Sequence, residues 1–163
     1  TKGQASPTSM EGMVTKNQPF GVLSEQLNPL AMAVALDCGF VARGYAGDRE
    51  HLTELIRSAF HHDGLSLVDI LQPCVSLNKV NTWEWYGKRV YRIGEDHDLR
   101  DRVKAFEKAL EWGDRIPIGV IYRNDRPSFE KRIPVIGDGP LVDGSGRWQE
   151  LKERLSGSLK EFY

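Results

Sequence analysis

The apolar positions of this chain form short runs and helical spacings that alternate along most of its length. Nearly continuous apolar runs predict strands at residues 40–42, 65–71 and 117–122, the second of them typical of a parallel strand covered on both faces. Residues 1–27 have no such period and are rich in Gly, Ser, Thr, Pro and Gln, so we expect an ordered loop or a lid there. Strands that alternate with helices indicate an α/β fold with a mainly parallel sheet flanked by helices.

The first helix is expected where the longest apolar stretch, residues 29–36, follows a start signal. Asn28 can act as the N-cap, because its side chain accepts a hydrogen bond from a free backbone N–H group, and Pro29 suits the first helical position. We expect this helix to run to about Cys38 and to stop at Gly39.

A second helix is expected to begin at Asp48 and to be closed by Asp63-Gly64. A short third helix would follow Asn81 as its cap and run through Trp83 and Tyr86. The residues expected on the apolar face of the second helix are His51, Leu52, Leu55, Ile56, Ala59 and Phe60.

The clearest amphipathic pattern runs from Asp98 to about Trp112 and predicts a fourth helix. The residues expected to point inward from it are Leu99, Val103, Phe106, Ala109 and Leu110. Beyond Arg123 the composition turns to Arg, Asp, Pro and Gly, and a last weak helix is expected from Trp148 to Leu159. We therefore divide the chain into an α/β domain over residues 1–122 and a loop-rich tail with a short helix over residues 123–163.

Charge and composition narrow the possible function classes. A formal net charge of −1 excludes the broad basic footprint of a nucleic-acid binder. No window approaches the roughly 18 apolar residues of a membrane span, and no signal peptide opens the chain, so we expect a cytoplasmic protein with no membrane partner. Two cysteines are too few for a disulfide framework. The first residue is Thr1 rather than Met, from which we expect a truncated or processed start.

Cys74 lies where parallel sheets place their ligands, just beyond the carboxyl end of the strand at residues 65–71. Pro73 cannot donate to the sheet, so it helps to end this strand and fixes the approach to Cys74. The Cys74 thiolate is a candidate ligand of an iron–sulfur cluster, but a small buried residue at a strand end is the alternative. Cys38 falls on an apolar helix face and is expected in the core, so any cluster would draw its other ligands from elsewhere.

The opening stretch, Thr1 to Gln4, has the ingredients of an anion site. Gly3 permits a close approach of the backbone, Thr1 and Gln4 offer hydrogen bonds, and Lys2 offers a positive charge. The string is short, and a frayed terminus has the same composition.

Three further groups carry weaker signals. The segment His61-His62-Asp63 resembles a metal cluster, but neighbouring helical residues diverge by about 100°, and a helix end that favours positive charge explains it better. The aromatic residues Trp83, Trp85 and Tyr86 suit either packing or stacking on a ring. The basic residues Arg123, Arg126, Lys131 and Arg132 suit a solvated loop or the docking of an acidic protein.

Several motifs occur together in an order that resembles one known family. These motifs are Thr1-Lys2-Gly3-Gln4 with Ser6-Pro7-Thr8-Ser9, Pro19-Phe20-Gly21, Asn28-Pro29, Phe40-Val41-Ala42-Arg43, Leu67-Val68-Asp69-Ile70-Leu71-Gln72-Pro73-Cys74, Asn81-Thr82-Trp83 with Trp85-Tyr86, and Pro117-Ile118-Gly119. From Thr1 to about Tyr122 the chain resembles the carboxyl-terminal part of the beta subunit of 2-oxoacid:ferredoxin oxidoreductases, the subunit that binds thiamine diphosphate.

This resemblance implies specific site residues. In the family, the stretch that matches Thr1, Lys2, Gly3 and Gln4 borders thiamine diphosphate and the 2-oxoacid pocket, and Lys2 would act catalytically by pairing with the substrate carboxylate or the cofactor phosphates. Cys74 would be one ligand of a [4Fe-4S] cluster. A lysine at position 2, rather than a second glycine, is more similar to the two-subunit 2-oxoacid and 2-oxoglutarate enzymes than to the pyruvate enzymes.

The resemblance also implies a reaction and partners. A 2-oxoacid such as 2-oxoglutarate or pyruvate would be decarboxylated oxidatively, its acyl group would pass to coenzyme A, and electrons would pass through the cluster to ferredoxin. The alpha subunit of the same enzyme is the expected protein partner.

The chain also departs from the family's pattern. The family's Gly-Asp-Gly…Asn motif, which supplies Mg²⁺ ligands, and its amino-terminal cysteines have no match here. We therefore expect a chain that is inactive in isolation, with part of its sheet left to be covered by self-association or by the missing part. The alternative is a non-catalytic binding or scaffolding module derived from the same fold. A generic α/β nucleotide binder is disfavoured, because no glycine-rich loop follows a strand.

Overall fold

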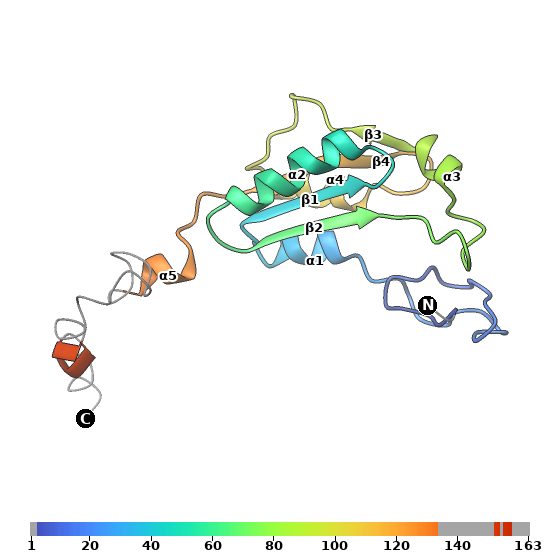
Figure 1. Cartoon of the computed structure of the whole chain (residues 1–163), viewed down its shortest axis with the longest axis horizontal. Coiled ribbons are helices and arrows are strands. Elements are labelled where there is room, and N and C mark those ends of the chain that lie inside the picture. The colour runs from blue at the N-terminus through green and yellow to red at the C-terminus, as the bar shows by residue number, and fades with distance from the viewer. Residues whose placement is uncertain (1–2, 134–151, 154, 158–163) are drawn as a thin grey trace. The chain divides into compact units, whose positions relative to one another are not determined.

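The computed structural model describes residues 3–133, 152–153 and 155–157, in two compact units, Thr1–Asp125 and Arg126–Tyr163. The first unit is built on one mixed sheet whose strands lie in the order β2-β1-β4-β3 (Figure 1). Its strands are β1 (Phe40–Tyr45), β2 (Ser66–Leu71), β3 (Val90–Arg92) and β4 (Ile116–Arg123). The pairs β1–β2 and β3–β4 are parallel, whereas the central pair β1–β4 is antiparallel. The predicted α/β class is confirmed, with a sheet that is mixed at its centre.

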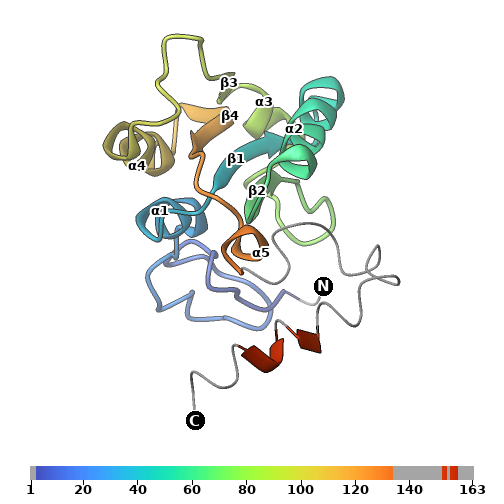
Figure 2. The same cartoon turned by 90° about the vertical axis from the view of Figure 1, so that its left-hand side faces the viewer.

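Helices cover both faces of this sheet. The first unit holds α1 (Pro29–Ala35), α2 (Arg49–His61), α3 (Trp83–Gly87) and α4 (Arg102–Leu110). Figure 2 shows α1 and α4 on one face of the sheet and α2 on the other. In the second unit, α5 spans Phe129–Arg132, and residues 152–153 and 155–157 are helical. Residues 148–151, 154 and 158–159 of the weak helix predicted there lie outside the described residues.

The α1 helix begins as predicted and ends earlier. The Asn28 side chain accepts from the Ala31 N–H group, which confirms Asn28 as the N-cap. The helix ends at Ala35 rather than near Cys38, because Asp37 takes a left-handed conformation with φ of 58°. The Tyr122 hydroxyl donates to the Asp37 carboxylate over 2.5 Å and holds this turn in place. A tertiary contact from β4, rather than a glycine, stabilises the helix end.

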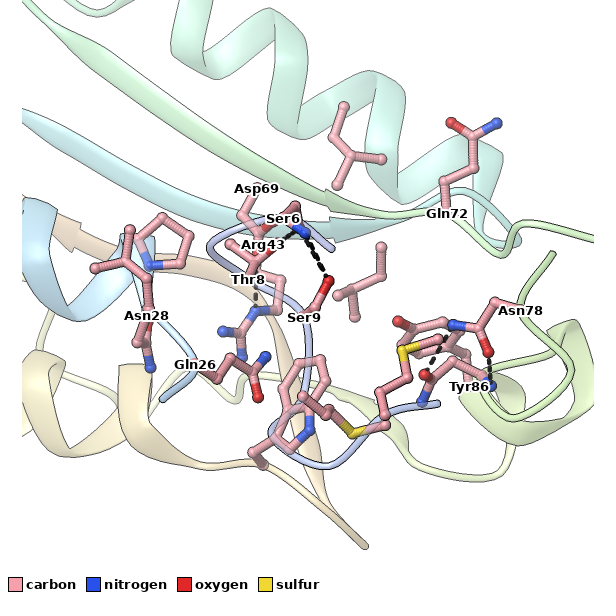
Figure 3. Close-up of a pocket in the computed structure, with 18 of the residues that line it drawn as sticks. Ser6, Thr8, Ser9, Gln26, Asn28, Arg43, Asp69, Gln72, Asn78 and Tyr86 are labelled. Carbon is pink, nitrogen blue, oxygen red and sulfur yellow. Dashed lines mark hydrogen bonds and ion pairs between the residues drawn. The ribbon is translucent and has the colours of Figure 1, made fainter. Parts of the chain in front are cut away.

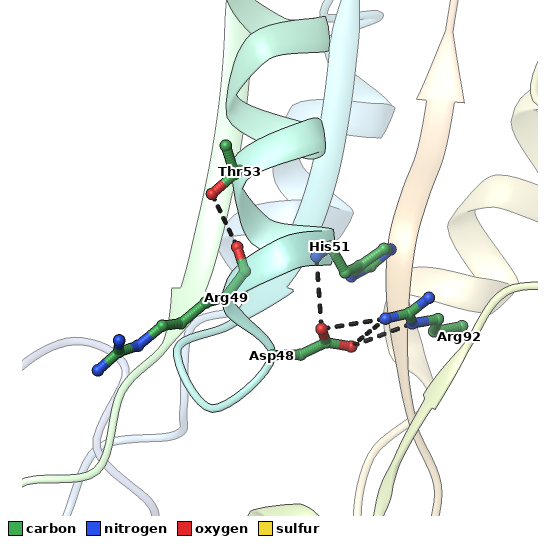
Figure 4. Close-up of polar contacts among 5 residues, drawn as sticks. All are labelled: Asp48, Arg49, His51, Thr53 and Arg92. Atoms are coloured by element: carbon green, nitrogen blue, oxygen red, sulfur yellow. Dashed lines mark hydrogen bonds and ion pairs between the residues drawn. The ribbon is translucent and has the colours of Figure 1, made fainter.

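The start of α2 is joined to β3 by one carboxylate. Asp48 accepts from the His51 backbone N–H group and so caps the helix, as predicted. The same carboxylate forms a two-pronged ion pair with Arg92, with N–O distances of 2.8 to 3.0 Å (Figure 4). Arg92 and the hydrogen bond at His51 outweigh the partial desolvation of the carboxyl group, so the pKa of Asp48 is lowered.

The buried side of α2 is narrower than its apolar pattern predicts. Leu55 is the buried residue of this helix, and Leu52 and Ala59 are half-buried. Ile56 and Phe60 are exposed, with Phe60 at 85% of its possible surface, so the prediction that they point inward was wrong. The apolar face of α2 is therefore buried only in part.

The cap of α3 is one residue later than predicted. The Thr82 side chain, rather than Asn81, accepts from the Trp85 N–H group at the helix start. Asn81 is instead a buried loop residue whose side-chain oxygen accepts from Asn78 over 3.0 Å. Both residue types cap helices well, and the packing of the loop decides between them.

The α4 helix begins at its N-cap Asp101 and turns a different face to the core than predicted. Its buried residues are Ala105 and Ala109, whereas Val103 and Leu110 are exposed. The small alanine side chains let α4 lie close to α1, and the Asn28 side chain donates to the Ala109 carbonyl. Of the five residues predicted to face inward from this helix, only Ala109 is buried, so most of the predicted face was wrong.

Two strand predictions also need correction. The β1 strand continues past Ala42 to Tyr45, and every one of its six residues is buried, including the charged Arg43. The β2 strand lies at the edge of the sheet and is mostly half-buried, so the prediction that it is covered on both faces was wrong. The short β3 strand was not predicted, because three residues carry too little pattern to detect.

The core is divided by the sheet. On one face, α1 and α4 enclose a cluster that includes Val34, Val41 and Ile121. On the other face, Phe40, Ala42 and Leu55 pack beneath α2. A third cluster lies around α3, where Tyr45 of β1 packs with Tyr86. Cys38 is buried at the edge of the first cluster, which confirms its predicted place in the core.

Candidate functional site

The short α1 helix covers only the amino-terminal part of the β1–β2 pair on its face of the sheet. With seven residues, α1 spans about 10 Å, whereas the six-residue strands β1 and β2 span about 20 Å. Val41 and Leu67, near the amino ends of these strands, pack in the cluster that α1 covers. Arg43 and Asp69, two residues further along, line a cavity of about 560 Å³ instead. The cavity thus lies toward the carboxyl ends of the two parallel strands, where open sheets place their ligands.

Six segments of the sequence contribute to the walls of this cavity (Figure 3). The lining combines polar and apolar residues in similar measure, its charged residues are Arg43 and Asp69, and its apolar part includes two methionines and a tryptophan. The lining residues are Ser6, Thr8, Ser9, Met10 and Met13, then Gln26, Leu27, Asn28 and Pro29, then Arg43 and Asp69 to Gln72, then Asn78, Asn81 and Tyr86, and finally Leu110 and Trp112.

Arg43 and Asp69 form a charge pair across the β1–β2 ladder, where they are register partners. Arg43 Nε donates to Asp69 Oδ2 over 3.1 Å, and the guanidinium lies 5.4 Å from the centre of the Trp112 ring. The Arg43 side chain is 3% exposed, so burial lowers the pKa of its guanidinium, and the Asp69 carboxylate opposes this effect. The pair therefore brings one buried positive charge to the cavity wall together with its counter-charge.

The Cys74 thiol is exposed, so the alternative of a small buried residue at the strand end was wrong. Pro73, immediately before it, is buried and ends the strand as predicted. The chain then turns, and the Asn78 N–H group donates to the Cys74 carbonyl over 3.1 Å. Backbone N–H groups of this turn, that of Leu77 first and then those of Asn78 and Ser76, stabilise the thiolate and lower the pKa of Cys74.

The opening stretch is described only in part. Thr1 and Lys2 lie outside the described residues. Gly3 adopts a φ of 76°, which favours glycine, and its carbonyl accepts from the Thr15 hydroxyl over 2.5 Å. Gln4 is exposed. Neither Gly3 nor Gln4 lines the cavity, and neither does Cys74, but the residues that follow each predicted motif do line it.

The weaker sequence candidates have structural roles within the described residues. His62 is the C-cap of α2, and its buried Nε2 atom has no hydrogen-bond partner among the residues that the structure describes. Residues 3–133, 152–153 and 155–157 contain no group of three or more His, Cys, Asp or Glu side chains placed to hold a metal ion. No helix in these ranges is long and apolar enough to cross a membrane.

The aromatic residues of α3 contribute to packing at the cavity. Tyr86 is buried against Tyr45, and its pKa is raised by burial and by the nearby Asp69 carboxylate. Trp83 is 43% exposed, and its backbone carbonyl accepts from the Tyr45 hydroxyl. The Trp85 ring lies 4.4 Å from the guanidinium of Arg89 and 6.4 Å from the ring of Trp112. Of the basic residues noted in the sequence, Arg123 ends β4 and is exposed, and Arg126, Lys131 and Arg132 belong to the second unit.

Sequence reasoning did not assign a role to Arg43, Asp69 or Asn78. One available signal was the charged residue inside each of two neighbouring apolar runs, because a buried charge needs a partner and parallel neighbours can supply it. Asn78 carries no comparable signal, because Asn is common in any loop.

Family and sequence comparisons agree on one group of proteins. Residues 74–138 match the family described as the C-terminal part of the pyruvate ferredoxin oxidoreductase beta subunit. The chain is 47% identical over 145 residues to a 2-oxoacid:ferredoxin oxidoreductase subunit beta from Sulfolobus sp, an alignment that covers 82% of this chain and 48% of that protein. The corresponding subunit from Saccharolobus solfataricus is 45% identical over the same shares of the two chains. The chain therefore spans about half the length of the curated relatives that it matches.

A relative matched over a shorter stretch and a solved structure carry 2-oxoglutarate in their names. The 2-oxoglutarate oxidoreductase subunit KorB from Mycobacterium tuberculosis is 47% identical over 78 residues, which are 48% of this chain and 21% of that protein. The 2-oxoglutarate:ferredoxin oxidoreductase from Magnetococcus marinus, solved with 2-oxoglutarate, coenzyme A and succinyl-CoA bound, matches with a TM-score of 0.79 and 31% identity. That match covers 94% of this chain and 52% of the solved chain.

Proposed function

Because this chain belongs to the family of 2-oxoacid:ferredoxin oxidoreductase beta subunits, we propose that it forms part of a catalytic beta subunit. The assembled enzyme would decarboxylate a 2-oxoacid oxidatively, transfer the acyl group to coenzyme A and pass the electrons to ferredoxin. Its other subunit would be the alpha subunit of the same enzyme, and the setting would be the cytoplasm. Among substrates we favour 2-oxoglutarate over pyruvate, because two of the relatives bear that name.

One observation carries this proposal. A single cavity is lined both by Ser6 to Ser9, which closely follow the opening Thr1–Gln4 stretch, and by Asn78, which follows Cys74. A thiamine-type reaction needs its ring close to the first electron acceptor, because electrons released on decarboxylation must leave one at a time. A cavity that joins the two segments supports a short path between a cofactor held near Lys2 and a cluster held by Cys74.

The surroundings of Cys74 fit one ligand of a [4Fe-4S] cluster. A thiolate is the ligand that such clusters require, and backbone N–H donors around the sulfur stabilise it. The thiol is exposed, so it can reach a cluster whose other three ligands come from elsewhere. When bound, the cluster would supply one-electron transfer, and the part of Cys74 is to hold one iron.

The fit to thiamine diphosphate is partial. Thr1, Lys2, Gly3 and Gln4 remain proposed cofactor contacts, with Lys2 as the proposed catalytic residue through its charge toward the substrate carboxylate or the diphosphate. For Mg²⁺, the described residues contain no group of three or more His, Cys, Asp or Glu side chains placed to hold a metal ion. We therefore assign the Mg²⁺ ligands to residues outside the described ranges and expect this chain to be inactive alone.

That same lack of a metal-ligand cluster within the described residues favours one alternative. A non-catalytic binding or scaffolding module derived from this fold would keep the sheet and its cavity but would not need a group of metal ligands. The two functions differ in whether the assembly that contains this chain oxidises a 2-oxoacid.

The test uses the assembled enzyme that contains this chain. Reduction of a viologen dye is measured with 2-oxoglutarate and with pyruvate, each with and without coenzyme A, and the iron content is determined. Cys74→Ala is expected to lose both the cluster signal and the coenzyme A-dependent reduction. The matched control is Cys38→Ala, because Cys38 is the other cysteine and is buried in the core. This control should keep both the iron and the activity.

The outcomes separate the two functions. Reduction that requires coenzyme A and Cys74 would establish the oxidoreductase, and the faster of the two 2-oxoacids would name the preferred substrate. Full cluster loading without any reduction by either acid would favour the scaffolding module. The chain purified alone, given thiamine diphosphate, Mg²⁺ and either acid, is expected to reduce no dye.

A further inference from the structure

The wall of the cavity contains a buried amide whose donor group has no partner. Asn81 lines the cavity and is 7% exposed. Its Nδ2 atom is buried and has no hydrogen-bond partner among the residues that the structure describes. The side chain does not cap α3, because Thr82 does so. A buried donor without an acceptor costs stability, and an acceptor on a bound ligand would remove that cost.

The neighbouring Asn78 fixes the orientation of this amide. The Asn78 Oδ1 atom accepts from the Val80 N–H group over 2.9 Å and from the Asn81 N–H group over 3.0 Å. Since both of these partners are donors, the Asn78 Nδ2 group is left to donate to Asn81 Oδ1, over 3.0 Å. Reversing the Asn81 amide would set two donors against each other, so its own Nδ2 group must lie on the side away from this bond.

The fold also holds Asn81 in place. It directly precedes the N-cap of α3, and Tyr86 of this helix is buried against Tyr45 of β1. Tyr86 itself lines the cavity. A donor that is already positioned loses little conformational freedom when a ligand arrives, so more of its hydrogen bond contributes to affinity.

The charges of the cavity favour an uncharged ligand group. Arg43 is the positive residue of the lining, and Asp69 pairs with it over 3.1 Å. Because the two charges oppose each other, the cavity offers little net attraction to a carboxylate or a phosphate. The rest of the lining presents amide and hydroxyl groups among apolar side chains that include Met10, Met13 and Trp112. This lining suits a flexible apolar chain that carries uncharged carbonyl oxygens.

Among the molecules of the proposed reaction, coenzyme A has such a chain. Its pantetheine arm is uncharged and contains amide groups, whereas every 2-oxoacid carries a carboxylate at neutral pH. The cavity volume of about 560 Å³ lies in the range of sites that hold drug-sized ligands, and a molecule as small as pyruvate would fill little of it. The phosphates of coenzyme A belong to its nucleotide end and would lie outside the cavity.

We propose that this cavity receives the pantetheine arm of coenzyme A and that Asn81 Nδ2 donates a hydrogen bond to an amide carbonyl of that arm. This inference rests on the proposed function, which makes coenzyme A a substrate. Asn78 is then a positioning residue, because its side chain determines which end of the Asn81 amide meets the ligand.

The test measures coenzyme A binding to the assembled enzyme by calorimetry, together with the KM values for coenzyme A and 2-oxoglutarate in dye reduction. Asn81→Asp replaces the donor by an oxygen and keeps the oxygen that Asn78 contacts. Asn78→Asp keeps both backbone bonds of Oδ1, but its second carboxylate oxygen should turn the Asn81 amide round, so that Oδ1 of Asn81 meets the ligand. Both variants are expected to raise the Kd and the KM for coenzyme A by about tenfold, with the KM for 2-oxoglutarate unchanged. Gln72→Glu is the matched control, because it adds the same charge to the lining outside the Asn78–Asn81 pair.

The three variants give distinct outcomes. A Kd for coenzyme A that rises in both asparagine variants by more than in Gln72→Glu would establish the role of Asn81. Equal changes in all three would mean that the added charge alone acts, and would overturn the inference. A raised KM for 2-oxoglutarate at an unchanged KM for coenzyme A would also overturn it, because the donor would then serve the 2-oxoacid.

Two further measurements complete the test. If neither asparagine variant assembles, pantetheine is added to the wild type: inhibition competitive with coenzyme A supports the inference, and its absence overturns it. Calorimetry needs no turnover, so this inference and the proposed function can fail separately. An assembly that reduces no dye but binds coenzyme A through Asn81 would overturn the oxidoreductase and keep the binding site. One that reduces dye normally, with coenzyme A bound equally well by all variants, would overturn this inference alone.

Discussion

The two ends of the parallel β1–β2 pair have opposite surroundings. At the amino end, Cys38 is buried and its thiol lies 3.4 Å from the Leu65 carbonyl and 3.5 Å from that of Phe40. At the carboxyl end, Cys74 is exposed beside a polar cavity, within a turn held by hydrogen bonds. The same residue type thus fills space at the closed, apolar end and presents a thiolate at the open end.

Along the six residues of each strand, the residues that stabilise the fold are therefore separate from those that border the candidate site. Apolar burial stabilises by roughly 25 cal/mol for each Å² removed from water, and the closed end gains from it through the cluster around Val34, Val41 and Ile121. The open end must keep polar groups accessible, so it relies on directed hydrogen bonds and on one buried ion pair. The Arg43–Asp69 pair lies between the two ends. Substitutions at this pair and at each end test whether stability depends mainly on the closed end.

The largest effect is expected from breaking the Arg43–Asp69 pair. Asp69→Asn would leave the Arg43 charge, whose side chain is 3% exposed, without its counter-charge, and should lower the free energy of unfolding by about 3 kcal/mol. Urea denaturation measures this change. The double variant Arg43→Met with Asp69→Leu removes both charges and should recover most of the loss. A double variant no more stable than Asp69→Asn would show that the cavity wall needs the charges themselves.

A matched pair of valines compares the two ends directly. Val41 is fully buried beneath α1, and Val75, next to Cys74, is 65% exposed. Val41→Ala should lower the free energy of unfolding by about 2 kcal/mol, because it removes two buried methyl groups and leaves a small cavity. Val75→Ala should change it by less than about 0.5 kcal/mol. If thermal or urea unfolding shows that both variants lose the same free energy of unfolding, the contrast between the two ends is contradicted.

The smallest expected effect is a pH dependence that arises at the closed end. Burial, with a smaller contribution from the Arg123 charge, lowers the pKa of His62. The unfolded chain therefore takes up a proton near pH 6.5 that the folded chain takes up only at lower pH, and stability should fall as the pH drops below about 6.5.

His51 contributes in the same direction, since burial also lowers its pKa. Unfolding by urea at several values between pH 5 and 7 measures the slope. The variant His62→Gln should have a shallower slope than the wild type, with the remainder due to His51. Identical slopes in the two proteins would mean that His62 gains no proton on unfolding.

Local signals of the sequence predicted the elements well where the residues act on their own neighbours. Asn28 and Asp48 cap their helices because capping needs only a side chain and the next turn of backbone. The buried faces could not be predicted in the same way. Ala105 and Ala109 are the residues of α4 that face the protein core, because α1 packs closely against α4 there. The larger Val103 is 71% exposed. The spacing of apolar residues in one helix does not indicate which other helix packs against it.

The candidate site was predictable in its position but not in its contacts. Cys74 follows the carboxyl end of β2, as predicted, and its role as a cluster ligand stays a prediction. The cavity depends on Arg43, Asp69 and Trp112, which come together only after three separate segments have folded. The roles of Thr1 and Lys2 remain predictions, as they lie outside the described residues.

The antiparallel pairing of β1 with β4 at the centre of the sheet affects when the sheet can form during synthesis. Phe40 at the start of β1 pairs with Arg123 at the end of β4, so the central strand meets its second neighbour only when nearly the whole first unit exists. At about 5 to 20 residues added per second, a ribosome would reach β4 on the order of ten seconds after β1. During this interval β1, whose six residues are all buried in the folded first unit, would have one unpaired edge, which makes the nascent chain a natural client for a chaperone.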